Sequence, residues 1–231
     1  MKLWERLFVR ASVAEAETAG RFRRLRLRAP ALRGAAWVAG QQVRVDVAAK
    51  GAMTPLLRTY SVWDRAHDWV DLQALLHGDG PGAQWMGAAA VGDEVLISKP
   101  KGDFVTRPAA YHLFVGEETA SVAFGPMLRA LPREQRTASR AVVEIAGPAD
   151  RLALDGDVTW VERRGDAVSP SPSLVAAVEA LDLPGEPGQA YVAGEARTIQ
   201  AVRQHLVRER GWPRRSVLTK PFWTPGKRGM E

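Results

Sequence analysis

The ten residues Thr106-Arg107-Pro108-Ala109-Ala110-Tyr111-His112-Leu113-Phe114-Val115 divide the sequence into two parts with different patterns. Before them, short runs with β-branched and aromatic residues alternate with Gly, Pro and Asp turn signals, which is typical of successive β-strands. After them, apolar strand-like runs alternate with helical stretches, a pattern that indicates βαβ units on a parallel sheet. We therefore predict two domains, residues 1–106 and residues 107–231.

The N-terminal part contains six strand-like runs, which predict a small six-stranded antiparallel barrel. The predicted strands span residues 6–13, 22–28, 42–47, 57–63, 69–76 and 93–98, and one helix is expected over 84–90. On the second strand, arginines alternate with Phe22, Leu25 and Leu27. We therefore expect these arginines to form one polar face of the strand.

The C-terminal part predicts a parallel-sheet α/β domain, because strands and helices follow one another in turn. Its predicted strands span residues 111–115, 141–145, 158–161, 190–193 and 216–218, and its predicted helices span 127–131, 174–181 and 199–210. The fold class is accordingly an antiparallel barrel followed by an α/β domain.

The composition narrows the class of protein. The chain has 231 residues, 46% of them hydrophobic, but contains no apolar run long enough to span a membrane, and its first ten residues lack the pattern of a signal peptide. We expect a cytoplasmic monomer that does not bind a membrane. With no Cys, it cannot form disulfides or cysteine-ligated iron–sulfur clusters, and its four His show no metal-ligand spacing.

The net charge of +6 suits nucleic acid, an anionic surface or an anionic small molecule. The eight Trp are scattered along the chain and are not interleaved with basic residues, as they are in a platform for single-stranded nucleic acid. A basic nucleic-acid-binding protein is therefore only a distant alternative, and we expect no nucleic-acid partner.

The tetrapeptide Arg58-Thr59-Tyr60-Ser61 lies on the fourth predicted strand. Arg58 and Tyr60 then project to one face, and Ser61 ends the strand on the other face. A guanidinium pairs bidentately with a pyrophosphate, a phenol ring can lie on an isoalloxazine, and a hydroxyl can hydrogen-bond the flavin N5 edge. Each residue taken alone is also ordinary for an exposed or strand-terminal position.

The segment Leu76-His77-Gly78-Asp79-Gly80-Pro81-Gly82-Ala83-Gln84-Trp85 follows where a second phosphate-binding element is needed. Glycines ahead of a helix, with proline near its first position, expose free N–H groups toward an anion in a favourable dipole direction. The alternative is a glycine-rich turn without a ligand.

Six segments, taken in order, resemble the landmarks of the siderophore-interacting proteins, a family of the ferredoxin-reductase superfamily. They are RTYS, LHGDGPGAQW, VGDEVLISKPKGDF, FVGEETA, VAGEA and the terminal PFW-PG, and together they cover nearly the whole chain. The resemblance implies FAD on the barrel and NADPH or NADH on the second domain. The FAD-binding residues that it implies are Arg58, Thr59, Tyr60, Ser61, His77, Gly78, Gly80, Gly82, Ala83 and Gln84.

The same resemblance supplies the nicotinamide site, because the chain has no GxGxxG motif. The residues implied are Glu118, Thr119, Ala120, Gly194 and Glu195. The chain departs from the family pattern at Val122, where a proline is usual, and at Ala83, where a serine is frequent. Pro126 lies inside the expected helix and favours an irregular first turn.

Glu144 ends the second predicted parallel strand. An acidic side chain there can bind ribose hydroxyls and would repel a 2′-phosphate, which favours NADH. Arg151 and Arg163 are close enough in sequence to support the opposite preference. The choice between NADH and NADPH stays open on the sequence.

The resemblance implies an enzyme that transfers electrons from NAD(P)H through flavin to a ferric siderophore, releasing iron as Fe(II). Such anionic chelates suit a basic pocket, for which Lys50, Lys220 and Lys227 are the candidate residues. No protein acid–base group is required, because the flavin carries the redox chemistry. The alternative within enzymes is a flavin oxidoreductase with another acceptor, such as a quinone or a partner protein.

Overall fold

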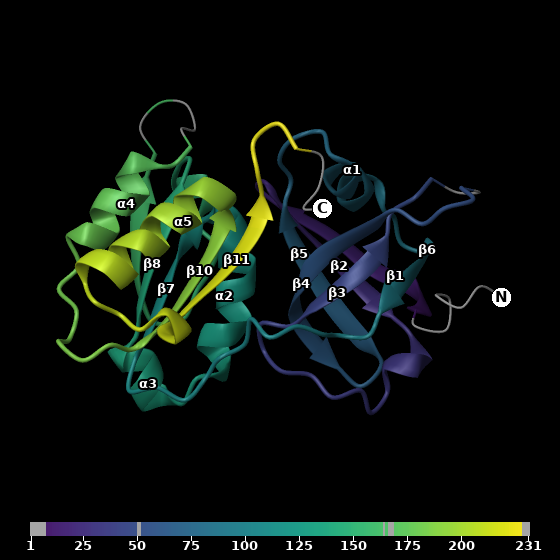
Figure 1. Cartoon of the computed structure of the whole chain (residues 1–231). Coiled ribbons are helices and arrows are strands. Elements are labelled where there is room, and N and C mark those ends of the chain that lie inside the picture. The colour runs from purple at the N-terminus through teal and green to yellow at the C-terminus, as the bar shows by residue number, and fades with distance from the viewer. Residues whose placement is uncertain (1–7, 50–51, 164, 166–168, 228–231) are drawn as a thin grey trace. The chain divides into compact units, whose positions relative to one another are not determined.

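The computed structural model describes residues 8–49, 52–163, 165 and 169–227 (Figure 1). The chain divides between Val105 and Thr106 into two compact units. The first unit is a barrel and the second is an α/β unit, as the change of pattern at Thr106 predicts. Each unit has a hydrophobic core of its own.

The first unit is a closed barrel with the strand order β1-β2-β5-β4-β3-β6, and each neighbouring pair is antiparallel. The strands are β1 (Phe8–Ala19), β2 (Phe22–Arg28), β3 (Gln42–Asp46), β4 (Leu57–Ala66), β5 (Trp69–Leu75) and β6 (Glu94–Ser98). One helix, α1 (Pro81–Ala88), lies between β5 and β6 in the sequence. The predicted six-stranded barrel is confirmed.

Along the barrel strand β2, side chains that face the core alternate with side chains that face outward. On β2, Leu25 and Leu27 are completely buried in the core, whereas Arg26 between them lies outside. The Arg26 guanidinium donates to both carboxylate oxygens of the buried Asp71, at 2.7 and 2.9 Å, and its Cζ lies 3.9 Å from the Trp69 ring centroid. The predicted polar strand face is confirmed for Arg24 and Arg26, which both contact Asp71, and a bidentate ion pair organises it. Arg23 was wrongly included, because it lies on the same face of the strand as Leu25 and donates to the Ala89 carbonyl at 2.6 Å.

The second unit is a five-stranded parallel sheet with the order β11-β10-β7-β8-β9. The strands are β7 (His112–Glu117), β8 (Arg140–Ile145), β9 (Asp157–Glu162), β10 (Gln189–Glu195) and β11 (Val217–Trp223). The helices are α2 (Glu118–Ala130), α3 (Arg133–Ala138), α4 (Pro172–Glu179) and α5 (Ala196–Gln204). Helices α4 and α5 cover one face of the sheet, and α2 covers the other (Figure 1).

Alternate residues of β7 fill the two layers of this unit. Leu113 and Val115 pack with residues of α4 and α5. Phe114 points to the other face, where it stacks on Tyr191 at 5.1 Å and meets Phe124 of α2 edge-on at 5.4 Å. Within the part of the chain that the structure describes, no helix is both long and apolar enough to cross a membrane.

Several predicted boundaries were wrong. Helix α1 begins at Pro81 and not at residue 84, because proline is well suited to the first helical position. Helix α2 begins at Glu118, nine residues before the predicted start, since Gly125 and Pro126 mask the helical pattern. The short helix α3 was not predicted.

The expected irregular first turn of α2 is not found. Pro126 is the ninth residue of this helix, so its missing N–H affects the carbonyl of Val122 and not the first turn. The strand β11 is also longer than predicted and continues to Trp223. The segment Lys220–Trp223 is therefore part of the sheet and not a loop that follows it.

Candidate functional site

In the barrel unit, Tyr60 joins β4 to the start of α1. Its hydroxyl donates a hydrogen bond to the carbonyl of Gly82 at 2.7 Å, and its ring lies 5.5 Å from the ring of Trp85. The side chain is largely buried, and burial raises the pKa of the phenol well above its ordinary value. Tyr60 is therefore a neutral donor that sets the position of the first helical turn.

Gly82 lies in a cradle that a side chain would fill. A Cβ at this position would be 3.0 Å from the Tyr60 hydroxyl and 3.4 Å from Cγ of Arg58. The N-cap of α1 is Gly80, with no side-chain cap and no acidic residue in the first turn. The N–H groups of Gly82 and Ala83 have no partner within the helix. The Arg58 stem lies beside this turn, and its guanidinium donates to the Leu57 carbonyl at 2.7 Å. A helix N-terminus of this kind, next to an arginine, fits an anion such as a pyrophosphate.

The remaining predicted flavin residues have varied environments. Thr59, Gly78 and Gln84 are exposed, whereas His77, Gly80 and Ala83 are partly buried. Ser61 does not end its strand, as predicted, because β4 continues for five residues to Ala66. Ser61 is consequently a buried mid-strand residue paired with Gln42, and its contact with the flavin stays a prediction.

The α/β unit has a topological switch point between β7 and β10. From β7 the chain builds β8 and β9 on one side, and then crosses over to β10 and β11 on the other side. Ligands of open α/β sheets bind outside the carboxyl ends of the strands at such a point. Here β7 ends at Glu117 and β10 ends at Glu195, and each strand continues directly into a helix.

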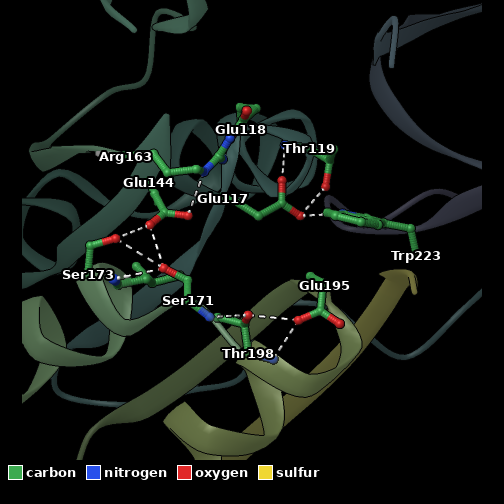
Figure 2. Close-up of polar contacts among 11 residues, drawn as sticks. Glu117, Glu118, Thr119, Glu144, Arg163, Ser171, Ser173, Glu195, Thr198 and Trp223 are labelled. Atoms are coloured by element: carbon green, nitrogen blue, oxygen red, sulfur yellow. Dashed lines mark hydrogen bonds and ion pairs between the residues drawn. The ribbon is translucent and has the colours of Figure 1, made fainter. Parts of the chain in front are cut away.

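Glu117 is the central residue of this switch point (Figure 2). Its carboxylate accepts hydrogen bonds from the Thr119 N–H at 2.7 Å, the Thr119 hydroxyl at 2.5 Å and the Trp223 indole N–H at 2.9 Å. Thr119 was predicted from the sequence, but Glu117 was not. An acidic residue immediately before a helix is an N-cap signal that could have identified it.

Gly194 makes the contact between Glu117 and Trp223 possible. Its φ is +123°, and a Cβ there would lie 2.3 Å from the Glu117 carboxylate oxygen. The pairing of β10 with β11 shifts after Gly194, so that Glu195 is opposite Trp223. Because β10 lies between β7 and β11, the indole reaches Glu117 across the one strand position that has no side chain.

Glu195 caps α5 as Glu117 caps α2. Its carboxylate accepts from the N–H groups of Arg197 and Thr198 and from the Thr198 hydroxyl, all within 2.9 Å. Burial acts to raise the pKa of Glu195, but these hydrogen bonds hold it below the ordinary value. At Glu117 burial dominates, and the pKa rises to about 7.

A second polar cluster lies at the carboxyl end of β8 (Figure 2). Glu144 and Glu118 are both buried, and the Arg163 guanidinium lies between them, 3.1 Å from the Glu144 carboxylate and 2.6 Å from that of Glu118. The hydroxyls of Ser171 and Ser173 donate to the other oxygen of Glu144. The sequence did not indicate either serine, and it named Glu144 and Arg163 only as rivals.

The two helix N-termini at the switch point already hold carboxylates of the chain itself. The N–H groups of Thr119, Arg197 and Thr198 already donate to these side chains, so they are not available to a phosphate. The absence of a GxGxxG motif agrees with this arrangement, because that motif presents free N–H groups to a pyrophosphate. Ala120, also predicted here, is completely buried, 2.4 Å from where a Cβ on Gly116 would lie.

The three predicted acceptor residues are not brought into one described site. Lys50 lies outside the described residues. Lys220 is a partly buried residue of β11 opposite Ala193, and Lys227 is exposed beyond the end of that strand. Their contact with an acceptor stays a prediction.

Gly194→Ala is expected to lower the free energy of unfolding by roughly 2 to 4 kcal/mol, because the new methyl group meets Glu117 and alanine disfavours this φ. Denaturant titration measures the loss. Gly185→Ala is the control, since nothing lies within 4 Å of a Cβ there, and it should change stability by less than about 1 kcal/mol. Equal effects would show that position 194 tolerates a side chain.

Glu117→Gln tests the buried carboxylate through the pH dependence of stability. Since burial raises the pKa of Glu117 from 4.5 to about 7, the native state keeps a proton that the unfolded chain releases. The stabilisation that this proton provides is complete below pH 4.5 and is lost as the pH rises through about 7. As the pH rises from 5 to 8, the free energy of unfolding of the variant should therefore increase relative to that of the wild type, by on the order of 3 kcal/mol. Parallel stability curves would contradict the assignment.

Comparison with known proteins places both units in one family. Residues 13–104 match the family model described as the siderophore-interacting FAD-binding domain, and residues 109–226 match the model described as siderophore-interacting protein. The first description makes FAD the cofactor of the barrel unit, which agrees with the anion cradle at Gly82.

Individual relatives agree with these matches. An uncharacterised protein of Mycobacterium tuberculosis is 32% identical over 177 residues, which cover 69% of this chain and 62% of that protein. The ferric vibriobactin reductase ViuB of Vibrio cholerae is 27% identical over 183 residues, which cover 75% of this chain and 66% of the relative. The chain therefore spans only part of the length of these relatives.

The fold is shared with solved structures. The crystal structure of a siderophore utilization protein from T. fusca has a TM-score of 0.82 at 22% identity, and the match covers 97% of this chain and 95% of that one. The predicted ferredoxin-reductase type of fold is thereby confirmed. With two family models matched in order over residues 13–104 and 109–226, the chain belongs to the siderophore-interacting protein family.

Proposed function

We propose that this protein is an FAD-dependent oxidoreductase that passes electrons from a nicotinamide dinucleotide through flavin to a ferric siderophore. The observation that carries the proposal is the uncapped N-terminus of α1 beside Arg58, inside the region that matches an FAD-binding domain. The relative named ferric vibriobactin reductase supports the choice of acceptor.

In the barrel unit, Arg58 and the N–H groups of Gly82 and Ala83 would hold the FAD pyrophosphate. Tyr60 would keep the carbonyl of Gly82 directed away from the phosphates, because it already donates to that oxygen. Both contacts depend on glycine at position 82, since a larger residue would press against Tyr60 and Arg58. Thr59, Ser61, His77 and Gln84 are proposed to contact the remainder of the cofactor.

In the α/β unit, the switch point between β7 and β10 would hold the nicotinamide and its ribose. Glu117 and Glu195 hold the first turns of α2 and α5 in place, and they discourage the pyrophosphate from binding at these turns. The hydroxyl and carboxamide groups of the donor are hydrogen-bond donors and suit this acidic edge. Thr119 and Gly194 line the same point and would orient the ring.

The number of electrons moved in each step separates the role of the flavin from that of the side chains. A nicotinamide donor delivers two electrons together, whereas each ferric ion accepts one, and bound FAD supplies the chemistry that connects these steps. The side chains of this protein therefore need to bind, orient and exclude water, but not to donate or remove a proton. The excess of positive charge, with Lys220 and Lys227 as candidates, would attract an anionic chelate.

Arg58→Ala is expected to weaken FAD binding by about one to two decades, because a charge-assisted contact with pyrophosphate is worth roughly 1.5 to 3 kcal/mol. Equilibrium titration of the apoprotein with FAD measures this. The control is Arg10→Ala, which removes an arginine paired with Glu94 on the exposed surface of the same unit. Equal dissociation constants for the two variants, or a wild type that takes up no FAD, would overturn the assignment.

Lys220→Ala is expected to raise the KM for an anionic ferric siderophore by about two- to fivefold, through loss of long-range attraction. Steady-state rates over a panel of anionic and neutral ferric chelates and a quinone test this. Arg208→Ala, which removes the same charge from an exposed position, should have a smaller effect. A quinone that is preferred to every ferric chelate would refute the siderophore as acceptor.

A further inference from the structure

The carboxyl end of β8 is the place where the fold can distinguish NADH from NADPH. Glu144 lies in register with Glu117 of β7, on the neighbouring strand of the sheet. In dinucleotide-binding α/β folds, an acidic residue near the end of the second strand binds the adenosine ribose hydroxyls, or an arginine there accepts a 2′-phosphate. This chain carries both residue types, so their contacts decide which is available.

Two buried carboxylates engage the Arg163 guanidinium. Its Nε lies 3.1 Å from Glu144, and an Nη lies 2.6 Å from Glu118. The carboxylate side chains are each 4% exposed and the guanidinium is 17% exposed, so solvent screens these ion pairs little. A 2′-phosphate that approached Arg163 would also approach these two carboxylates, which would repel it.

The hydroxyl donors around this position are engaged as well. Ser171 and Ser173 both donate to the Glu144 oxygen that does not face Arg163. Ser171 is also the N-cap of α4, where its hydroxyl oxygen accepts from the Leu174 N–H at 3.2 Å. The two hydroxyls that could otherwise donate to a phosphate are thus directed at Glu144.

The charges of the cluster also oppose a 2′-phosphate. In these two ion pairs, two carboxylates face one guanidinium. A phosphate monoester brings a further charge of about −1.5 to −2 near neutral pH. We propose that the Glu118–Arg163–Glu144 cluster, with Ser171 and Ser173, makes NADH the electron donor and excludes NADPH; this inference rests on the proposed function.

The wild type tests the inference directly. Calorimetric titration should give an NAD⁺ dissociation constant at least about tenfold below that of NADP⁺, and stopped-flow flavin reduction should favour NADH over NADPH by a similar factor. Binding is measured without turnover, so it reports on the cluster even if the acceptor is not a siderophore. Equal or tighter binding of NADP⁺ would overturn the inference and leave the proposed function standing.

Glu144→Gln tests whether Glu144 is responsible for the preference for NAD⁺ over NADP⁺. It removes one negative charge and one partner of Arg163, so the preference for NAD⁺ over NADP⁺ should fall by about fivefold or more. Glu162→Gln is the matched control, because it removes the same charge from an exposed ion pair with Arg151 in the same unit, and it should leave the preference unchanged. A fall in both variants would indicate a general charge effect and contradict the cluster. If neither dinucleotide binds the wild type, the proposed function fails together with the inference.

Discussion

The Glu117 carboxylate holds together segments of the α/β unit that are far apart in the sequence. It accepts from Thr119 at the start of α2 and from Trp223, 106 positions later, at the end of β11. A carboxylate buried this deeply needs several donors, because its removal from water is costly. This requirement explains why β11 continues to Trp223 and why β10 carries glycine at position 194, where a Cβ would meet the carboxylate.

The helix N-termini of the chain are used in two different ways. Helices α2 and α5 begin at glutamates that cap them, and the N-cap serine of α4 is directed at Glu144. Helix α1 begins at Gly80 and Pro81, with no side-chain cap and no acidic residue in its first turn. Because a helix N-terminus attracts negative charge, the start of α1 suits an exogenous anion, whereas α2 and α5 are already capped by carboxyl groups. The proposed phosphate position and the two capped helices thus differ in this one feature.

Much of the architecture could be predicted from local pattern. The alternation on β2 places Leu25 and Leu27 in the core and Arg24 and Arg26 outside, and the change at Thr106 marks the start of the α/β unit. Such patterns succeed because they follow from backbone geometry, which repeats every two residues in a strand. The prediction failed at α2, where Gly125 and Pro126 oppose the helical pattern, and at β11, which continues through Pro221 to Trp223. Packing of those segments against the sheet overrides their weak propensities.

The candidate site, like the fold, could be predicted from the sequence only in part. The sequence by itself determined the residue types that suit flavin, Arg58 and the glycine-rich turn, because turn glycines and an N1 proline act through local backbone geometry. Only the tertiary structure decided that Tyr60 meets Gly82, that Trp223 reaches Glu117, and that Glu144 pairs with Arg163 instead of competing with it. The physical reason is that a buried charge takes its partners from whichever strands and helix ends the fold brings near. No local sequence pattern indicates which groups the fold brings near a buried charge.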